Sequence, residues 1–548
     1  MADYCAFPKK GRGKKGALCT IWREKRARLP SAVKNLLFPR IPKPTAMERQ
    51  RPPPAAKRAR TSPPQAQAAG ADDRLSALDD ATLHAIIARL PLRDAAATAA
   101  LSRRWPRVFA TLPRLILRPA TFNRRGFPDD GDDDRCEDAG RWMDSLARVL
   151  RCRAAPVVAL DVEAEFLGRY GEQFHGVLRV VCGSGELLEL GLANTEHTAC
   201  PAPALPKPVY ACSTITSLDL YNWRLRVPSK LTGLRAVRWL RLRNVVATDA
   251  DLRRVISRCR ALEHLEIHDV HRARNVVIRA PRLERLVIYS YRPLCISVKE
   301  TPPLDTVRLG LSYGYPECSW TLHDSKDSDG DYSSREIEVM LDYKKMAERE
   351  HKKTNEIGNM VKFLSGLGRV KNLRLYLSTE YSQVLSMTKG SMPKKLPEKS
   401  LLLGLETLAL TLDHNHEVLA TLVSCLLNSS PNLKDFRITE LRHSGSPVPL
   451  PANFWEKQIN ADCVLNYLSS VTFYTDSLFE GRPWGGLFRF LVMKAKDLKK
   501  MTIEYHYSQV KPEHEAILEA VRRGFHLWPR ASLDVLLELS PLDRCPCF

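Results

Sequence analysis

A short apolar pattern recurs along this chain and limits the folds available to it. In each copy, an apolar residue is followed by two other residues, a second apolar residue, one further residue and a third apolar residue. Twelve copies occur, and most begin 21–35 residues after the previous one. Their first residues are Val157, Leu187, Ile215, Val237, Leu262, Leu283, Leu304, Val370, Leu405, Leu433, Leu468 and Leu498. This regular spacing predicts that each copy forms one short strand of a repeat structure.

The segments between the copies indicate how the strands are joined. Residues 250–259 and 418–427 have the apolar spacing of helices, which favours parallel crossovers over hairpins. We therefore expect an α/β protein in which residues 157–462 form an irregular leucine-rich repeat solenoid, with an insertion at about 312–356. A β-sandwich is the alternative. In several copies an Asn or Asp follows the third apolar position by two residues, at Asn194, Asn222, Asn244 and Asp269.

Residues 72–111 have a different pattern, which is that of short helices. Apolar residues recur at helical spacing up to Pro91, a second helix is predicted to begin with Asp94 as its N-cap, and a third short segment contains Trp105. Three short helices bury little surface on their own, so we expect a partner to cover part of it.

This helical segment resembles the F-box, and in particular the plant F-box proteins that carry leucine-rich repeats. The matching residues include Arg93-Asp94 and the sequence LSRRW at 101–105. The resemblance implies docking to a Skp-family adaptor, which joins a cullin–RING ubiquitin ligase. The adaptor-facing residues that it implies are Leu78, Leu83, Ile86, Leu90, Pro91, Leu101 and Trp105. Asp79 stands where the family usually has proline. It can begin the helix by capping, but it removes an apolar contact. A three-helix subdomain unrelated to the F-box is the alternative.

Residues 463–538 resemble the FBD module that closes many plant F-box repeat proteins. The resemblance rests on Cys463, Phe479, Gly481, a predicted helix over residues 487–495, and the sequence LKKM at 498–501. It implies two more strands and a helix that cover the end of the solenoid, as terminal repeats must.

The remaining segments are expected to be tails and linkers. Residues 1–71 are a basic, Pro-rich tail that we expect to be disordered, residues 112–156 are a linker with an acidic loop, and residues 539–548 are a second tail. Residues 1–70 carry 17 Lys or Arg against 3 acidic residues, and therefore most of the net charge of +22. Lys57, Arg58 and Arg60 resemble a nuclear-import signal, with a solvated tail or nucleic-acid contact as alternatives. The expected location is the nucleus, the cytoplasm or both.

The sequence predicts a protein that is not an enzyme. It contains no phosphate-binding loop, nucleophile elbow or metal-spaced histidine pair, so we expect no catalytic residue, metal site or cofactor. His414 and His416 are interpreted as polar surface residues. Residues 325–336 match a calcium loop only in part and are predicted to be a solvated loop. Cys545 only partly fits a lipidation motif, no apolar run is long enough to span a membrane, and Met47 could start a shorter product.

Side chains that point away from the solenoid core are predicted to bind a partner. Because strand side chains alternate, the residue between the last two apolar positions of each copy lies on the concave face. Arginine and aromatic side chains, which are enriched in binding hot spots, recur there. The predicted substrate-binding residues are Trp239, Arg241, Arg243, Tyr289, Arg308, Arg374, Tyr376 and Arg437. We expect an acidic or phosphorylated protein segment as their ligand, in two patches separated by Glu266. A solvated charged face is the alternative.

Together these patterns predict the substrate-recognition subunit of an SCF-type ubiquitin ligase. Such a subunit catalyses nothing itself, but it raises the effective concentration of a substrate near the ligase. A leucine-rich repeat scaffold whose F-box docks weakly is the second hypothesis. A nuclear RNA-binding protein is the third, and the concentration of basic charge in the tail argues against nucleic-acid binding by the folded body.

Overall fold

The chain forms two compact units in a computed structural model, Met1–Leu187 (unit 1) and Leu188–Phe548 (unit 2). Each unit is considered by itself. The structure describes residues 78–90, 92–118, 143–151, 153–164, 167–168, 170–195, 202–292, 294–300, 304–312, 355–388, 390–441, 450–460, 465–475, 486–506 and 514–542.

Unit 1 begins with short helices that pack against one another and continues into two parallel strands. Helix α5 packs on α3, and α4 contacts both α5 and β1. Strand β1 pairs with β2 in parallel, so these strands are joined by a crossover. The elements are α3 (Asp80–Ile87), α4 (Leu92–Ala97), the 3-10 helix η1 (Thr98–Ala100), α5 (Trp105–Ala110), β1 (Arg114–Leu117), β2 (Ala159–Ala164) and α7 (Gly171–Gly183).

One predicted helix boundary in unit 1 is wrong. Asp94 was expected to be the N-cap of the second helix, but α4 begins at Leu92 and Asp94 lies within its first turn. A carboxylate is favourable at either position because the amino end of a helix carries partial positive charge. The sequence therefore placed Asp94 correctly near the amino end of the helix but did not identify the first residue of the helix.

Unit 2 is built around one parallel sheet. Each strand pairs in parallel with the next one along the chain, except that β7 and β9 pair with each other and leave β6, β8 and β10 adjacent. The strands are β3 (Glu189–Asn194), β4 (Ser217–Tyr221), β5 (Trp239–Val246), β6 (His264–His271), β7 (Asn275–Arg279), β8 (Arg285–Ser290), β9 (Cys295–Lys299), β10 (Thr306–Leu311), β11 (Asn372–Leu377), β12 (Thr407–Leu412), β13 (Asp435–Glu440), β14 (Ser470–Tyr474), β15 (Lys500–His506) and β16 (Leu536–Leu542).

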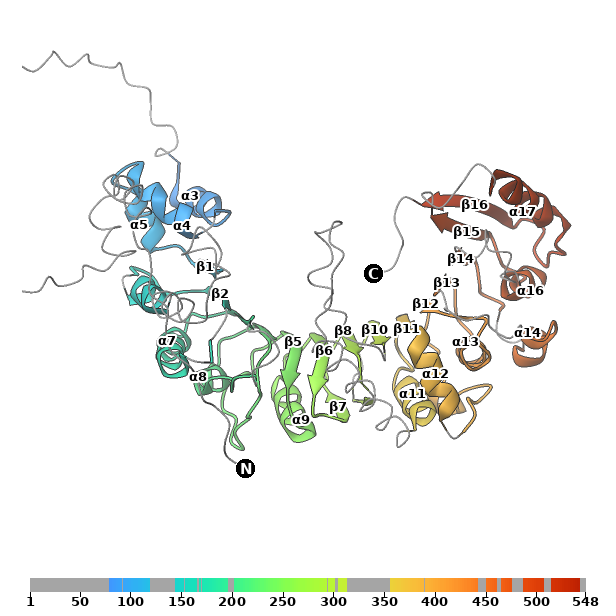
Figure 1. The fold of residues 1–548 in the computed structure, drawn as a ribbon, viewed down its shortest axis with the longest axis horizontal. Coiled ribbons are helices and arrows are strands. Elements are labelled where there is room, and N and C mark those ends of the chain that lie inside the picture. The colour runs from blue at the N-terminus through green and yellow to red at the C-terminus, as the bar shows by residue number, and fades with distance from the viewer. Residues whose placement is uncertain are drawn as a thin grey trace, which may run out of the picture. The chain divides into compact units, whose positions relative to one another are not determined.

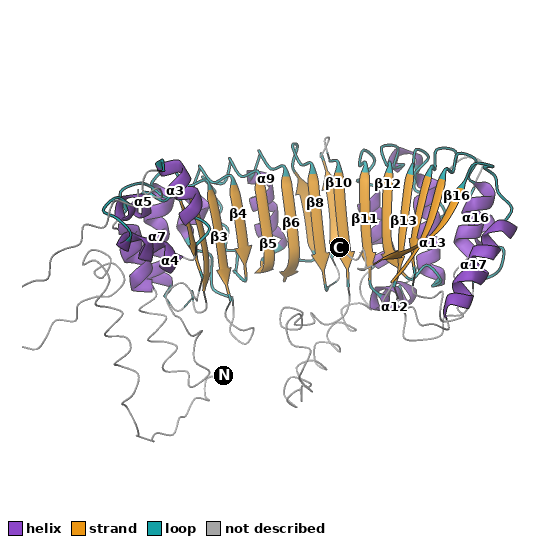
Figure 2. Cartoon of the chain, turned by 90° about the horizontal axis from the view of Figure 1, so that it is seen from above, coloured by secondary structure: helices purple, strands orange, loops and turns teal. Residues whose placement is uncertain are grey.

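The described helices of unit 2 lie on one side of its sheet, as Figure 1 shows, and the strands lie side by side in Figure 2. The connecting elements are α8 (Lys207–Ala211), α9 (Asp249–Arg258), α11 (Glu356–Leu364), α12 (Thr379–Met387), the 3-10 helix η3 (Glu398–Ser400), α13 (Glu417–Ser429), α14 (Phe454–Gln458), α16 (Gly486–Lys494) and α17 (Glu515–Leu527). Helix α9 begins with a capping box between Thr248 and Asp251, which satisfies amide groups at its amino end. We call the opposite side of the sheet, which carries Arg241, Arg308 and Arg374, the ladder face.

The apolar copies account for most of this sheet. All twelve first residues are buried, at most 4% exposed, and a strand begins two residues after each of them. In β4, Leu218 and Leu220 are buried, whereas Asp219 and Tyr221 remain partly exposed on the ladder face. The parallel repeat sheet is thus confirmed, and the β-sandwich alternative is wrong because the pairs that a sandwich needs are antiparallel.

Polar side chains at the end of several strands stabilise the turns between repeats. Asn222, Asn244 and Asp269 have φ angles of 59°, 52° and 51°, a left-handed conformation that Asn and Asp tolerate better than most residues. Asn222 Nδ2 donates a hydrogen bond to the carbonyl of Asn194 at 3.1 Å, and Asp269 Oδ1 accepts one from the Tyr291 amide at 3.0 Å. The recurring Asn or Asp therefore links each turn to a neighbouring repeat.

Replacing Asp269 with Asn is expected to stabilise the folded protein at neutral pH. Burial raises the pKa of Asp269 to about 6, although the Tyr291 amide opposes this shift. The carboxyl group therefore favours folding when protonated, and that contribution is lost as the pH rises from its unfolded pKa of about 4 to above 6. Asn keeps an oxygen for Tyr291 without the charge, and Asn222 and Asn244 already adopt the same left-handed conformation in equivalent turns.

We expect D269N to gain on the order of 1–2 kcal/mol in free energy of unfolding near pH 7.5, with a smaller gain near pH 5. Urea titrations at the two pH values measure the difference. A variant that is less stable than the parent near pH 7.5 would show that the charged carboxylate is the favourable form.

Candidate functional site

The adaptor-facing residues predicted in unit 1 divide into two groups. Leu83 and Trp105 are 0% and 2% exposed, so they form the core between the helices. Ile86, Leu90 and Leu101 are 36%, 38% and 59% exposed. Because apolar side chains normally leave water when a helix can bury them, these exposed residues are the part of the set that a partner can contact.

Polar contacts fix the relative position of the first and third helices of unit 1. Arg104 Nη1 donates to the carbonyl of Leu78 at 2.5 Å, and its Nε donates to Asp80 Oδ1 at 3.1 Å. Nε2 of His84 lies 3.1 Å from the carbonyl oxygen of Val108. The Arg104 of the LSRRW sequence therefore has a structural role in holding α3 against α5.

Asp79 is the N-cap of α3, as its sequence position suggested. Its carboxylate accepts a hydrogen bond from the Thr82 amide at 2.5 Å, and this bond lowers the pKa of Asp79. The substitution of Asp for the usual proline therefore preserves the start of the helix. Leu78 is half-buried, and Pro91 lies outside the described residues.

On the ladder face, the arginines of β5 are paired with carboxylates of the neighbouring strands. Arg241 donates from Nε to Glu266 at 2.8 Å and lies 3.3 Å from Asp219, which also pairs with Arg243 at 3.1 Å. Glu266 Oε1 lies 2.8 Å from Nε2 of His268. His268 and Arg241 together hold the pKa of Glu266 at about 2, so its charge persists at neutral pH. The positive and negative charges on this part of the face therefore balance one another.

Aromatic rings line the same part of the sheet. The Trp239 and His264 rings stack with centroids 3.8 Å apart, and Trp239 remains 48% exposed. The Arg243 guanidinium lies 5.6 Å from the centroid of the Tyr221 ring. An exposed, rigid tryptophan of this kind is suited to protein contact. Sequence reasoning identified Trp239 but missed His264, whose only signal was its equivalent position in the next apolar copy.

The arginines further along the ladder face have different surroundings. Arg308 on β10 lies directly opposite Arg374 on β11 in the parallel register. Neither has an ion pair with any carboxylate in the described part of the chain. Arg437 on β13 pairs with Asp435 of its own strand at 2.8 Å. Of the predicted arginines, then, Arg308 and Arg374 are the two that keep an uncompensated charge.

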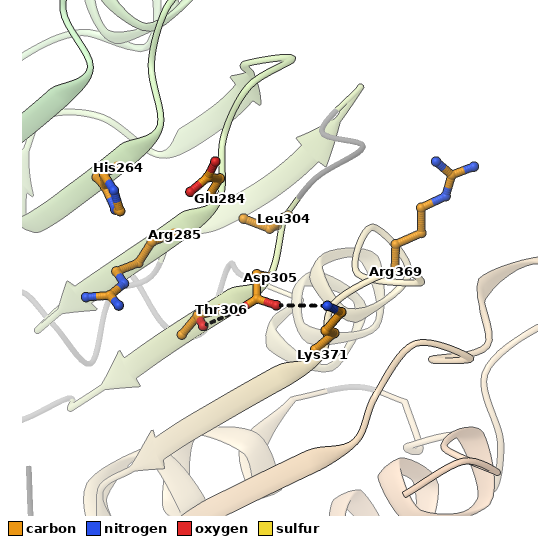
Figure 3. Close-up of a pocket in the computed structure, with 8 residues that line it drawn as sticks. All are labelled: His264, Glu284, Arg285, Leu304, Asp305, Thr306, Arg369 and Lys371. Carbon is orange, nitrogen blue, oxygen red and sulfur yellow. Dashed lines mark hydrogen bonds and ion pairs between the residues drawn. The ribbon is translucent and has the colours of Figure 1, made fainter.

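A shallow depression of about 440 Å³ lies where β8, β10 and β11 begin (Figure 3). In it, Asp305 accepts a hydrogen bond from the Thr306 hydroxyl at 3.0 Å and lies 3.7 Å from Lys371 Nζ. The lining residues are His264, Glu284, Arg285, Leu304, Asp305, Thr306, Arg369 and Lys371. Sequence reasoning missed this depression, because its signal is only a charged residue just before each strand. Its mixed charges suit polar contact with a partner more than acid–base chemistry.

Two of the described groups that could carry out chemistry are buried. His414, which we expected on the surface, is only 1% exposed and packs edge-on against Phe473 and Phe488, because the preceding strand directs it into the core. Burial raises the pKa of the Cys259 thiol to about 12, so it is a poor nucleophile. Among the described residues, no group of three or more His, Cys, Asp or Glu could hold a metal ion, and no helix could cross a bilayer.

Some predicted sites fall outside the described residues. They are the basic cluster of Lys57, Arg58 and Arg60, the partial calcium loop at residues 325–336, and Cys545 near the end of the chain. Tyr289 and Tyr376, which were predicted to bind substrate, lie within the described residues. Both are half-buried on the ladder face, and they lie on either side of Gly310 in the register.

Comparisons with known proteins agree with the repeat architecture. A family model described as FBD-associated F-box protein At5g56370, LRR repeats, matches residues 182–323. The F-box/LRR-repeat protein At3g26922 of Arabidopsis thaliana is 29% identical over 233 residues, which cover 40% of this chain and 67% of that protein. The F-box/FBD/LRR-repeat protein At1g80470 of the same plant is 27% identical over 260 residues, or 46% of this chain and 53% of that protein.

A third relative is similar along most of the chain. The putative F-box/FBD/LRR-repeat protein At4g00315 of Arabidopsis thaliana is 24% identical over 481 residues, which cover 83% of this chain and 97% of that protein. Other alignments span only about half of the relative, as for At1g80470. These similarities confirm the resemblance to plant F-box/FBD/LRR-repeat proteins that the sequence motifs indicated.

Proposed function

We propose that this chain, a relative of the plant F-box/FBD/LRR-repeat proteins, is the substrate-recognition subunit of an SCF-type cullin–RING ubiquitin ligase. Its first helices bind a Skp-family adaptor, and the ladder face of unit 2 binds the protein to be ubiquitinated. The proposal rests chiefly on one observation: short helices with a buried core around Leu83 and Trp105 keep Ile86, Leu90 and Leu101 exposed, at positions that face the adaptor in the F-box.

In this role the protein would act by bringing two partners together and would need no catalytic group of its own. A bound substrate and a bound ligase on one chain convert their encounter into an intramolecular event, which raises the effective concentration of substrate lysines near the ubiquitin-charged enzyme. The parallel sheet suits this role, because its side chains are held in register on rigid strands.

The test is whether the purified full chain forms a complex with a Skp-family adaptor. We expect the two proteins to co-elute from a size-exclusion column and to recruit a cullin into the same peak, as apolar anchors bind with affinities in the range of about 10⁻⁶–10⁻⁹ M. Separate elution at micromolar concentrations would overturn the ligase proposal and leave a repeat scaffold whose F-box does not dock.

A further inference from the structure

The clearest unexplained feature of unit 2 is the pair of arginines at the centre of the ladder face. Arg308 and Arg374 are directly opposed on neighbouring parallel strands, which are about 4.8 Å apart. Like charges that face each other in this way destabilise a sheet. In contrast, Arg241, Arg243 and Arg437 on the same face are each paired with a carboxylate. The fold therefore retains a repulsive pair on a face where Arg241, Arg243 and Arg437 are neutralised.

The immediate neighbours of this pair in the register are uncharged. In the register, Val287 lies beside Arg308 on the β8 side, and Ala409 lies beside Arg374 on the β12 side. Neither neighbour can supply a counter-ion. In addition, Nε of Arg308 is buried and has no hydrogen-bond partner among the described residues. A buried donor without an acceptor is costly, so contacts within the described part of the fold do not explain the position of Arg308.

A tyrosine is held beside the two arginines by a glycine. Gly310 lies between Tyr289 and Tyr376 in the register, and a Cβ atom at Gly310 would lie 2.2 Å from Cδ1 of Tyr289. The absence of a side chain thus allows the Tyr289 ring to lie over β10. Burial raises the pKa of Tyr289 even though the charges of Arg308 and Arg374 oppose this shift, so its hydroxyl keeps its proton at neutral pH.

We propose that Arg308, Arg374 and the Tyr289 hydroxyl form a subsite for a phosphate monoester, carried as a phosphorylated side chain by the substrate protein. A phosphate monoester has a charge of about −1.5 to −2 and three acceptor oxygens, which match two guanidinium groups and a hydroxyl donor. A carboxylate has only one charge, so it neutralises only one of the two arginines. The inference deepens the proposed function, and it rests on that function for the identification of the ligand as a substrate protein.

The test uses the purified full chain without an adaptor, so that its outcome is independent of ligase assembly. The probes are immobilised degenerate peptide libraries with a central phosphoserine, phosphothreonine or phosphotyrosine, and matched libraries with the unmodified residue or glutamate. We expect retention on at least one phosphorylated library to exceed that on its unmodified and glutamate counterparts by about tenfold or more.

The variants Arg308→Gln and Arg374→Gln are each expected to reduce that preference by about tenfold. The matched control is Arg254→Gln, which removes an exposed, carboxylate-paired arginine from α9 and is expected to leave the preference unchanged. Thermal melting of each variant shows whether a loss of binding follows from a loss of stability. Because they remove like-charge repulsion, the Arg308 and Arg374 variants are expected to melt no lower than the parent.

Other outcomes would overturn the subsite. Equal loss of binding in Arg241→Gln would indicate a uniformly basic face, as would retention on the glutamate library equal to that on the phosphorylated ones. Inorganic phosphate that competes as well as the phosphopeptides would indicate a small-anion site instead of a peptide site. Stronger competition by single-stranded RNA would indicate a nucleic-acid surface. A phosphopeptide preference without adaptor binding would support the subsite while contradicting the ligase proposal, so the two can fail separately.

Discussion

Replacing Trp223 with alanine is expected to lower the free energy of unfolding of unit 2 by about 4–5 kcal/mol. The side chain is only 1% exposed, and its indole nitrogen donates a hydrogen bond to the carbonyl of Leu192 at 3.0 Å. The substitution therefore leaves a large cavity and also deprives a buried carbonyl of its donor. Trp223 lies between β3 and β5, because its indole bonds to Leu192 on β3 and its own carbonyl accepts a hydrogen bond from the Val246 amide on β5.

The variant Trp223→Phe separates the two effects. It retains most of the ring volume but cannot donate the hydrogen bond, so we expect a loss of about 1–3 kcal/mol. Urea denaturation followed by circular dichroism measures both variants, with the denaturant slope checked for a change in cooperativity. Amide hydrogen exchange is expected to increase first in β3, β4 and β5, because each repeat is stabilised mainly by its neighbours. A loss below about 1 kcal/mol for alanine would mean that the neighbouring repeats collapse into the cavity.

The sequence could predict the strands of unit 2 because their signal is local and repeated. Each copy fixes which side chains alternate between the core and the ladder face, so Leu242 could be assigned to the core and Arg241 to the surface from six residues. Strands β7 and β9 were missed because they occupy positions where other repeats have a helix, and no copy of the pattern marks them. Trp223 could not be assigned, since its acceptor is 31 residues upstream.

Site residues were predictable by type but not by their electrostatic state. The order of the copies already places Asp219, Arg241 and Glu266 on adjacent strands, so the paired state of Arg241 follows from the register. Arg308 and Arg374 become neighbours because β10 pairs directly with β11, although 66 residues separate their copies. The residues that set their charge balance are thus distant in sequence, which local patterns do not reveal.

The helices of unit 1 show a second limit of sequence patterns. Leu83 and Ile86 are both apolar and lie three residues apart on α3, yet one is buried and the other is exposed. Helical spacing shows that an apolar side exists, but it does not distinguish the part that packs on α5 from the part left for a partner. Mutations chosen from the sequence alone would therefore confuse folding with binding.

Changing Ile86 and Leu101 together to aspartate is expected to weaken adaptor binding by about 100-fold or more, because two exposed apolar contacts become charges that the interface would have to desolvate. Both side chains already face solvent, so the melting temperature is expected to change by no more than about 2 °C. In contrast, Leu83→Ala removes a fully buried side chain and is expected to destabilise unit 1 by about 2–4 kcal/mol, with any loss of adaptor binding following from unfolding.

Biolayer interferometry on immobilised Skp-family adaptor, with circular dichroism melting of each variant, distinguishes these causes. The conservative variant Ile86→Leu is expected to bind within about threefold of the parent, because it keeps the apolar contact. If the double aspartate variant binds like the parent, the adaptor does not contact the exposed residues of α3 and of the turn after η1. The family's mode of docking would then not apply to this chain. If binding is lost and the melting temperature is kept, the exposed apolar residues act as the docking surface itself, and the buried Leu83 and Trp105 serve to present them.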